Sequence, residues 1–289
     1  MNAYEQIDFI RDLIGESAAA HWSTLNLLRR LNMAQNKIAI KLSMTPGDWL
    51  TKSDSVVVTN GVGSFPSDCS KPIYMEDSNG SPISWLAGGP AYRQVSRGAA
   101  GYPDDASQEA YVLANTFEVN TSTFSDTITL WYQRRVPELH MGFAASGSGA
   151  SALKFDTSTA EAVASNTYGT GKGIKFLNDY YNGVIVDIYN GSGIQDIRST
   201  ITDWDAATAV ATITGTPTAA DIYGTISVLP EESHMLMTFD AAIMALIKPG
   251  AKLDKEALQF VQTEYRAAKK EFDDWISIRV HAGMAVGRS

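Results

Sequence analysis

Hydrophobic residues recur at steps of three and four at both ends of the chain, the spacing that places side chains on one face of a helix. The pattern predicts four helices: Tyr4–Gly15, about Ser23–Leu42, a third starting at Leu229-Pro230, and about Asp254–Val280. Proline and two acids favour the third start, because acids complement the positive end of a helix dipole. The predicted apolar stripes are Ile7, Ile10, Leu13 and Ile14; Leu27, Leu31, Ala34, Ile38 and Leu42; Met235, Phe239, Ile243 and Leu246; and Val261, Tyr265, Ala268, Phe272, Trp275 and Ile276.

Between these helices the period changes to two, which is typical of strands. Runs separated by turns such as Asn60-Gly61 predict a β region, and the Gly/Ala/Ser run Gly142–Gly149 after it indicates a flexible linker. From there to residue 228, short strands joined by tight turns predict a small antiparallel barrel or sandwich. Three strand faces in that segment are Val184, Val186 and Ile188; Ile197, Ser199 and Ile201; and Val210, Thr212 and Thr214.

No predicted helix can bury its apolar stripe alone, and this bears on the fold class. The simplest joint arrangement is a four-helix bundle formed by both chain ends, with antiparallel β regions (sandwich or small barrel) inserted between helices 2 and 3. We therefore expect an α+β protein. Its parts are residues 1–46 (helices 1 and 2), 47–141 (an inserted β domain), 142–228 (an additional small β module) and 229–289 (helices 3 and 4 and a C-terminal tail). Two separate helical pairs remain the alternative.

Composition narrows the class of protein. The 289 residues are 44% hydrophobic and 19% charged, which is typical of a folded chain. A net charge of −9 argues against a protein that binds nucleic acid over a broad surface, because phosphate binding needs clustered Lys and Arg. With no cationic start before an apolar run and no run of membrane-spanning length, we expect neither a secretory signal nor a membrane partner.

Residues that could carry chemistry are scattered. Cys69 is the one cysteine and has no nearby histidine, so a buried or incidental thiol is favoured over a nucleophile. Gly169–Gly173 (GTGKG) lacks the spacing of a phosphate-binding loop and is interpreted as a turn. His234 falls on a helix start, where a surface or capping role is favoured. We expect no catalytic residue, no cofactor and no metal, because His21, His140, His234 and His281 show no metal-ligand spacing.

Three aromatic residues, Tyr180, Tyr181 and Trp204, are candidates for a glycan or partner contact. Aromatic rings in β turns can stack on sugars, which would make this segment a glycan binder. The favoured alternative is that they fill the core of the small barrel or lie in a subunit contact.

The segment that contains them, Asp179 to Thr214, reads DYYNGVIVDIYNGSGIQDIRSTITDWDAATAVATIT. It resembles a β module that recurs in structural proteins of tailed bacteriophages. In that module a YYNG-like strand start precedes a Gly-rich turn, an Arg-led strand, an aromatic between two acids and an A-T-rich strand. The resemblance implies a part of a virion.

A second resemblance covers residues 20–75 and 229–280, where four motifs occur in order. They are similar to those of the head-to-tail adaptor, or connector, proteins of tailed phages, with Ser233 where an aromatic is usual. Residues 142–228 depart from the family as an apparent insertion. The motifs are Leu31-Asn32-Met33-Ala34-Gln35, Pro66 to Tyr74 (PSDCSKPIY), Leu229 to His234 (LPEESH), and Glu264-Tyr265 through Glu271-Phe272.

This resemblance implies a structural ring, commonly of twelve copies, that docks on the portal protein and extends the DNA channel towards the tail. Expected partners are the portal, downstream nozzle or tail-tube proteins and other copies of the chain. DNA would pass during ejection without sequence-specific binding. The expected location is the virion, after assembly in the host cytoplasm. The alternative is another virion β protein, such as a decoration or receptor-binding subunit, and a cell-wall hydrolase comes third. Portal-binding candidates from the last helix and the unpatterned tail are Arg279, His281, Met284, Val286 and Arg288.

Overall fold

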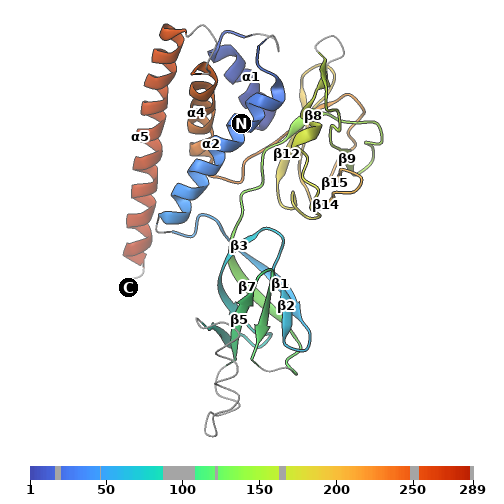
Figure 1. Cartoon of the computed structure of the whole chain (residues 1–289), viewed down its shortest axis with the longest axis vertical. Coiled ribbons are helices and arrows are strands. Elements are labelled where there is room, and N and C mark those ends of the chain that lie inside the picture. Colours follow the sequence, from blue (N-terminus) through green and yellow to red (C-terminus); the bar gives the residue numbers. More distant parts are fainter. Residues whose placement is uncertain are drawn as a thin grey trace. The chain divides into compact units, whose positions relative to one another are not determined.

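The computed structural model divides into two compact units, one formed by residues 1–49 and 136–289 and the other by residues 50–135. Figure 1 shows the ribbon of both units, and strands make up most of the elements. No helix among the described residues combines the length and the apolar character needed to cross a membrane. The residues that the structure describes are 1–16, 21–45, 47–86, 108–120, 123–162, 167–247 and 254–286.

The unit of residues 50–135, called here the barrel unit, contains one seven-stranded sheet in the order β1-β7-β3-β4-β5-β6-β2. The strands at the two ends of that order, β1 and β2, are joined by a tight turn at Asn60-Gly61 and a bridge between Thr59 and Val62. The sheet is therefore nearly closed. Its strands are β1 (Thr51–Val58), β2 (Val62–Ser64), β3 (Cys69–Glu76), β4 (Pro82–Trp85), β5 (Glu109–Leu113), β6 (Thr116–Val119) and β7 (Asp126–Arg134).

Alternate side chains of these strands fill the interior of the barrel unit, as a period of two requires. Met75, Ile128 and Leu130 have no exposed surface. A Cβ atom at Gly63 would lie 2.3 Å from the ring of Phe117, so only glycine lets the strand approach that ring. The core residues are Val56, Val58, Met75, Ile83, Ala110, Phe117, Val119, Ile128, Leu130 and Tyr132.

In the other unit the strands β8 to β16 form the β module, which has two main sheets around one core. A four-stranded sheet has the order β13-β12-β16-β8, and a three-stranded sheet has the order β14-β15-β9. Each neighbouring pair is antiparallel. The strands are β8 (Met141–Phe143), β9 (Ala152–Lys154), β10 (Glu161–Ala162), β11 (Thr167–Tyr168), β12 (Ile185–Tyr189), β13 (Gln195–Thr200), β14 (Asp203–Asp205), β15 (Val210–Thr212) and β16 (Ile222–Thr225).

The predicted strand faces in this segment are confirmed where they are apolar. Val184, Val186 and Ile188 are all buried in the core of the β module. The third predicted face, in β15, is different: Thr212 and Thr214 are exposed, and the neighbours Ala211 and Ile213 point inward. In this strand the apolar residues are buried and the threonines face the solvent.

The prediction of a flexible linker at Gly142–Gly149 is wrong. Its first residues belong to β8, which pairs with β16, and Ala144 is buried. A Cβ atom at Gly142 would lie 2.4 Å from Cβ of Asp156, so this glycine permits close packing. The predicted turn at Gly169–Gly173 is confirmed as a short 3-10 turn, η2 (Thr170–Gly173).

Within the described part of the chain, four α-helices accompany the β module. The predicted stripe of α2 is confirmed, because all five of its members are buried. α4 is different: Leu236, Phe239 and Ala242 are buried, together with residues on its other sides, so that it lacks a single buried stripe. The helices are α1 (Ala3–Leu13), α2 (Thr24–Met44), α4 (His234–Leu246) and α5 (Lys255–Val286), and a 3-10 turn, η3 (Glu231–Ser233), precedes α4.

The predicted four-helix bundle is wrong. The structure is mostly β, and the four helices among the described residues are not arranged as a bundle formed by the two chain ends. A bundle needs each helix to present one stripe to a shared core. Here α4 contacts α1, α2 and α5, while α1 also packs on β16 and β8 of the β module (Figure 1). The segment 142–228 therefore lies in the same compact unit as the helices.

Polar contacts tie the helices to this β module. The carboxylate of Glu161 in β10 accepts hydrogen bonds from the backbone N–H and the hydroxyl of Thr24, at 2.9 and 2.7 Å, at the first residue of α2. Asn2, which caps α1, donates to Asp187 in β12 at 3.1 Å. The side chain of Asn32 in α2 bonds both backbone groups of Leu139. Helices α1 and α2 are therefore each anchored at a defined position.

The last helix is longer than predicted. The sequence pattern ends it near Val280, whereas α5 runs to Val286. Ala282 and Gly283 do not interrupt the helix, so most of the predicted tail is helical. The last residues, 287–289, lie outside the described part of the chain.

Candidate functional site

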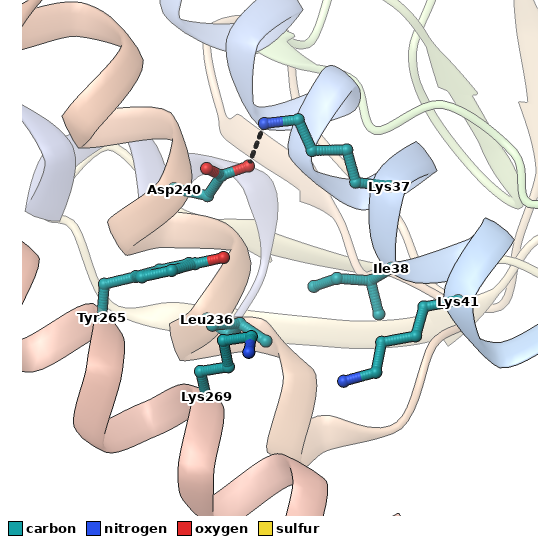
Figure 2. A pocket seen from close by; sticks show the side chains of 7 residues that line it. All are labelled: Lys37, Ile38, Lys41, Leu236, Asp240, Tyr265 and Lys269. Carbon is teal, nitrogen blue, oxygen red and sulfur yellow. Dashed lines mark hydrogen bonds and ion pairs between the residues drawn. The ribbon is translucent and has the colours of Figure 1, made fainter.

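A pocket of about 100 Å³ opens between α2, α4 and α5 (Figure 2). Ile38 and Leu236 supply its apolar part. Polar side chains surround them: Lys37 and Lys41 come from one turn of α2, because residues four apart share a helix face. The complete lining is Lys37, Ile38, Lys41, Leu236, Asp240, Tyr265 and Lys269.

Ion pairs connect the three helices around the pocket. Lys37 Nζ lies 2.7 Å from an oxygen of Asp240 and joins α2 to α4, as the dashed line in Figure 2 shows. Lys41 Nζ pairs with Asp273 and joins α2 to α5. Lys269 lies 3.7 Å from the same Asp273 carboxylate, one turn away on α5. The lysines of the pocket are thus neutralised by two acids from neighbouring helices.

Tyr265 extends from α5 across this pocket (Figure 2). Burial raises the pKa of its phenol, the Asp240 carboxylate raises it further, and nearby Lys37 lowers it. The phenol is therefore un-ionised at neutral pH and can act as a hydrogen-bond donor.

The size of the pocket limits its use. Pockets that enclose small-molecule ligands usually measure roughly 300–1,000 Å³. A volume of about 100 Å³ accommodates a few waters or the end of one side chain. We interpret the pocket as a seam between three helices, and as a surface that a partner's side chain could enter.

Aromatic packing fixes the middle of α5. Phe272 is fully buried and its ring centroid lies 5.9 Å from that of Trp275. Trp275 also contacts Trp49, with centroids 4.9 Å apart. The guanidinium of Arg279 lies 4.9 Å from the centre of the Trp275 ring, a cation–π contact. After buried Ile276 the side chains of residues 277–279 are exposed, although the helix continues.

The predicted portal-binding residues all fall at this end of the chain. Arg279 is exposed on α5 and held over Trp275. His281, Met284 and Val286 lie within α5, but their side chains are outside the described residues, as is all of Arg288.

The three aromatic candidates lie together in the β module, mostly in its core. Tyr181 and Trp204 are 0% and 1% exposed, and their ring centroids are 4.8 Å apart. Phe155 and Tyr223 complete the cluster, each with a ring about 5 Å from its neighbour. Tyr180 is partly buried, and its hydroxyl accepts a hydrogen bond from the Glu138 N–H at 3.0 Å. Two of the three rings are therefore inaccessible to a sugar.

A buried histidine, which the sequence did not single out, lies beside this cluster. His140 is fully buried, and burial lowers the pKa of its imidazole to about 4. Its Nε2 lies 3.1 Å from the Thr170 carbonyl, to which it donates, and Nδ1 accepts from the Tyr223 hydroxyl at 2.9 Å. A neutral ring with this tautomer satisfies both nitrogens. The ring has no exposed surface and both of its nitrogens are hydrogen-bonded, so it packs as part of the core.

His234 and Cys69, two further residues considered in the sequence, also lie in packed surroundings. His234 is buried at the start of α4, where Nε2 lies 3.2 Å from the Leu229 carbonyl. Of the predicted surface or capping role, the surface position is wrong. Burial and the charge of Asp68 raise the pKa of the Cys69 thiol to about 11. A thiol of that pKa is protonated at neutral pH and is a poor nucleophile, as predicted.

Sequence reasoning did not find the lysine–aspartate pairs around the pocket. A signal was present: Lys37 and Lys41, and Lys269 and Asp273, are each four residues apart in predicted helices. What the spacing does not show is which helices lie next to each other.

Comparisons with known proteins found no relative of this chain. No protein-family model matches the chain, and no curated protein matches its sequence. Within the residues that the structure describes, no group of three or more His, Cys, Asp or Glu side chains is placed to hold a metal ion.

Proposed function

We propose that this chain is a non-catalytic structural subunit of a tailed-phage particle. It acts as a head-to-tail adaptor that docks on the portal ring and extends the DNA channel to the tail proteins. Support comes first from the four ordered sequence motifs within residues 20–75 and 229–280.

The observation that carries the proposal is the C-terminal part of α5. The helix has 32 residues and α4, its main helical neighbour, has 13. At about 1.5 Å per residue, α5 is roughly 28 Å longer than α4. Beyond Ile276 the described side chains are exposed, and Ile278 is 70% exposed. A helix that extends beyond the residues packed against its own unit is suited to insert an amphipathic face into a groove of a partner.

The charge of the chain is compatible with a DNA channel. At a net charge of −9 the protein repels phosphate overall, so DNA could slide past without strong binding. An acidic net charge is common among proteins, so it does not by itself distinguish a channel protein.

The alternative function, a glycan-binding virion subunit, would depend on aromatic residues that are buried. Tyr181 and Trp204 are core residues of the β module, and a ring that stacks on a sugar must have a free face. We therefore retain the adaptor as the proposed function.

A test uses portal rings purified from the same virus. The full chain should co-sediment with these rings and form a coaxial layer in electron micrographs. Removing residues 280–289 takes away the end of α5 but keeps Phe272 and Ile276. We expect unchanged circular dichroism and melting temperature with loss of co-sedimentation.

A matched control is Phe176→Gln, which changes an apolar side chain that is 83% exposed and far from α5 in sequence. It should bind portal rings like the parent chain. Full binding by the truncated chain would show that the end of α5 is not the docking element. Absence of binding by the parent chain would reject the adaptor role.

A further inference from the structure

Two rows of mostly exposed side chains lie on α2 and α5, and each row mixes apolar groups with charges of one sign. On α2 the row consists of Arg29, Met33, Lys37, Ile40 and Met44 and is called the α2 row. On α5 it consists of Phe260, Glu264, Ala267, Glu271, Asp274 and Ile278, of which Glu264 is half-buried and the others are exposed, and is called the α5 row.

The α2 row is apolar and basic. Met33, Ile40 and Met44 are 53%, 56% and 80% exposed, and their steps of seven and four place them on one face. The helix Thr24–Met44 contains four basic residues and no acidic one, in a chain whose net charge is −9. Lys37 pairs with Asp240 but is still 57% exposed, so it can contact a second acid.

The α5 row is apolar and acidic. Phe260 and Ile278 are 57% and 70% exposed, and Glu264, Glu271 and Asp274 lie between them. At about 100° per residue, the row falls within an arc of about 80°. That arc is on the other side of the helix from Lys269 and Asp273, which face α2. Among the described residues no ion pair is recorded for the three acids of the row.

We infer that the α2 row of one copy packs against the α5 row of the next copy. The rows have opposite charges and comparable lengths, about 22 and 27 Å at 1.5 Å per residue. Arg29 and Lys37 would face Glu264 and Glu271, as charged positions do in coiled coils, and the apolar side chains of the two rows would pack beside these pairs. Exposed apolar rows that have no such partner are a liability in solution.

Such an interface is head-to-tail. It joins two different surfaces, so each added copy leaves one α2 row and one α5 row free until the chain of subunits closes. This inference deepens the proposed ring and rests on that proposed function. It specifies which surfaces join the subunits.

The test exploits this polarity. One variant, Met33→Gln with Ile40→Gln, disables the α2 row, and a second, Phe260→Gln with Glu271→Gln, disables the α5 row. Glutamine is a good helix former, and all four sites are exposed, so the fold should persist. In sedimentation velocity the parent should form oligomers, and each variant alone should be monomeric, with its dissociation constant raised about tenfold or more.

An equimolar mixture of the two variants gives the decisive result. Each still has one intact row, so one contact can form and the mixture should stop at dimers. Val57→Gln and Phe176→Gln are matched controls, because these apolar residues are 66% and 83% exposed and lie outside both rows. Both should assemble like the parent. If a double variant is misfolded by circular dichroism, Ile40→Gln and Phe260→Gln singly replace it.

Three outcomes would overturn the inference: a parent that stays monomeric at its highest soluble concentration, a disabled variant that assembles like the parent, or a mixture that regains the parent's size. Portal binding separates this inference from the proposed function. Oligomers that behave as expected but do not bind portal rings leave the interface intact and reject the adaptor role. A monomeric parent that binds portal rings keeps the adaptor role and rejects the interface.

Discussion

The barrel unit and the β module are both built from short antiparallel strands, yet they are completed in different ways. In the barrel unit the strands at the two ends of the sheet, β1 and β2, are joined by the Asn60-Gly61 turn, and a core from the same unit fills the interior. The β module has two separate sheets, and helix α1 packs on β16 and β8. We conclude that the barrel unit is stabilised by its own closure, and the β module by the helices around it.

The largest expected effect comes from removing one core aromatic from each unit. Trp204→Ala and Phe117→Ala should each lower the free energy of unfolding by about 3–5 kcal/mol, because both rings are fully buried. The location of the loss should differ. Hydrogen exchange should accelerate in α2 and α4 for Trp204→Ala and only in the strands of the barrel unit for Phe117→Ala.

The parent chain at the same temperature is the control for these exchange rates. If Trp204→Ala leaves the protection of α2 and α4 unchanged, the β module folds independently of the helices and the comparison fails.

The next effect is the pH dependence of the unit that contains His140. Its pKa of about 4 in the folded chain lies below the usual 6.5, so the unfolded chain binds this proton first as pH falls. Stability should be complete above about pH 6.5 and fall by about 3 kcal/mol on going to pH 4. Chemical denaturation at several pH values measures it.

The matched variant is His140→Gln, whose amide can still donate to the Thr170 carbonyl. Burial also lowers the pKa of His234, which acts in the same direction, so the difference between parent and variant isolates His140. Equal pH slopes for the two proteins between pH 4 and 6.5 would show that His140 does not control this dependence.

A smaller effect is expected from the carboxylate that joins β10 to α2. Glu161→Gln keeps the shape of the side chain but weakens its bonds to Thr24 and removes one of the two carboxylates near Arg11, at 3.7 Å, while Glu16 remains at 3.3 Å. Charge-assisted hydrogen bonds contribute roughly 1.5–3 kcal/mol, so we expect a loss of about 2 kcal/mol. Thermal unfolding followed at 222 nm measures it.

Glu118→Gln in the barrel unit is the control for a changed charge outside this contact. It should not alter the protection of α2 from hydrogen exchange. If Glu161→Gln melts like the parent, the carboxylate is not an anchor of the helix.

The smallest effect should come from the ion pair at the rim of the pocket. Lys37→Met removes the partner of Asp240, but the lysine is 57% exposed and water screens the pair. Exposed pairs contribute about 0.2–1 kcal/mol, so the coupling energy in a double-mutant cycle with Asp240→Asn should be about 0.5 kcal/mol. A coupling above about 2 kcal/mol would mean that the pocket is a tightly organised site.

The sequence predicted the elements that have strong periodicity. The stripe of α2, from Leu27 to Leu42, and the inward face of β12 are clear because large aliphatic side chains mark each position. The position of α4 was not predictable in this way. Ala241, Ala242 and Thr238 carry little hydrophobic signal, yet they are buried because other elements surround the helix.

Glycine was the other source of error. In Gly142–Gly149 it suggested flexibility, but Gly142 allows close packing against Asp156. The unpatterned run after Val280 suggested an end to the last helix, which nevertheless continues to Val286. For Tyr181 and Trp204 the favoured prediction, that they fill the core of the small barrel, is confirmed. The lysine–aspartate pairs of the pocket were missed because spacing along the chain does not encode which helices lie next to each other.

The open sheets of the β module have a consequence for aggregation. β13 (Gln195–Thr200) ends the order of its sheet, and a strand in that position can pair with a strand from another molecule. Asp196 and Arg198 are exposed on it, and the Arg198 guanidinium is held 3.1 Å from Asp187. Charges on an edge strand discourage amyloid-like pairing, whereas β1 and β2 of the barrel unit are joined to each other. Copies of this protein are therefore discouraged from joining through β13.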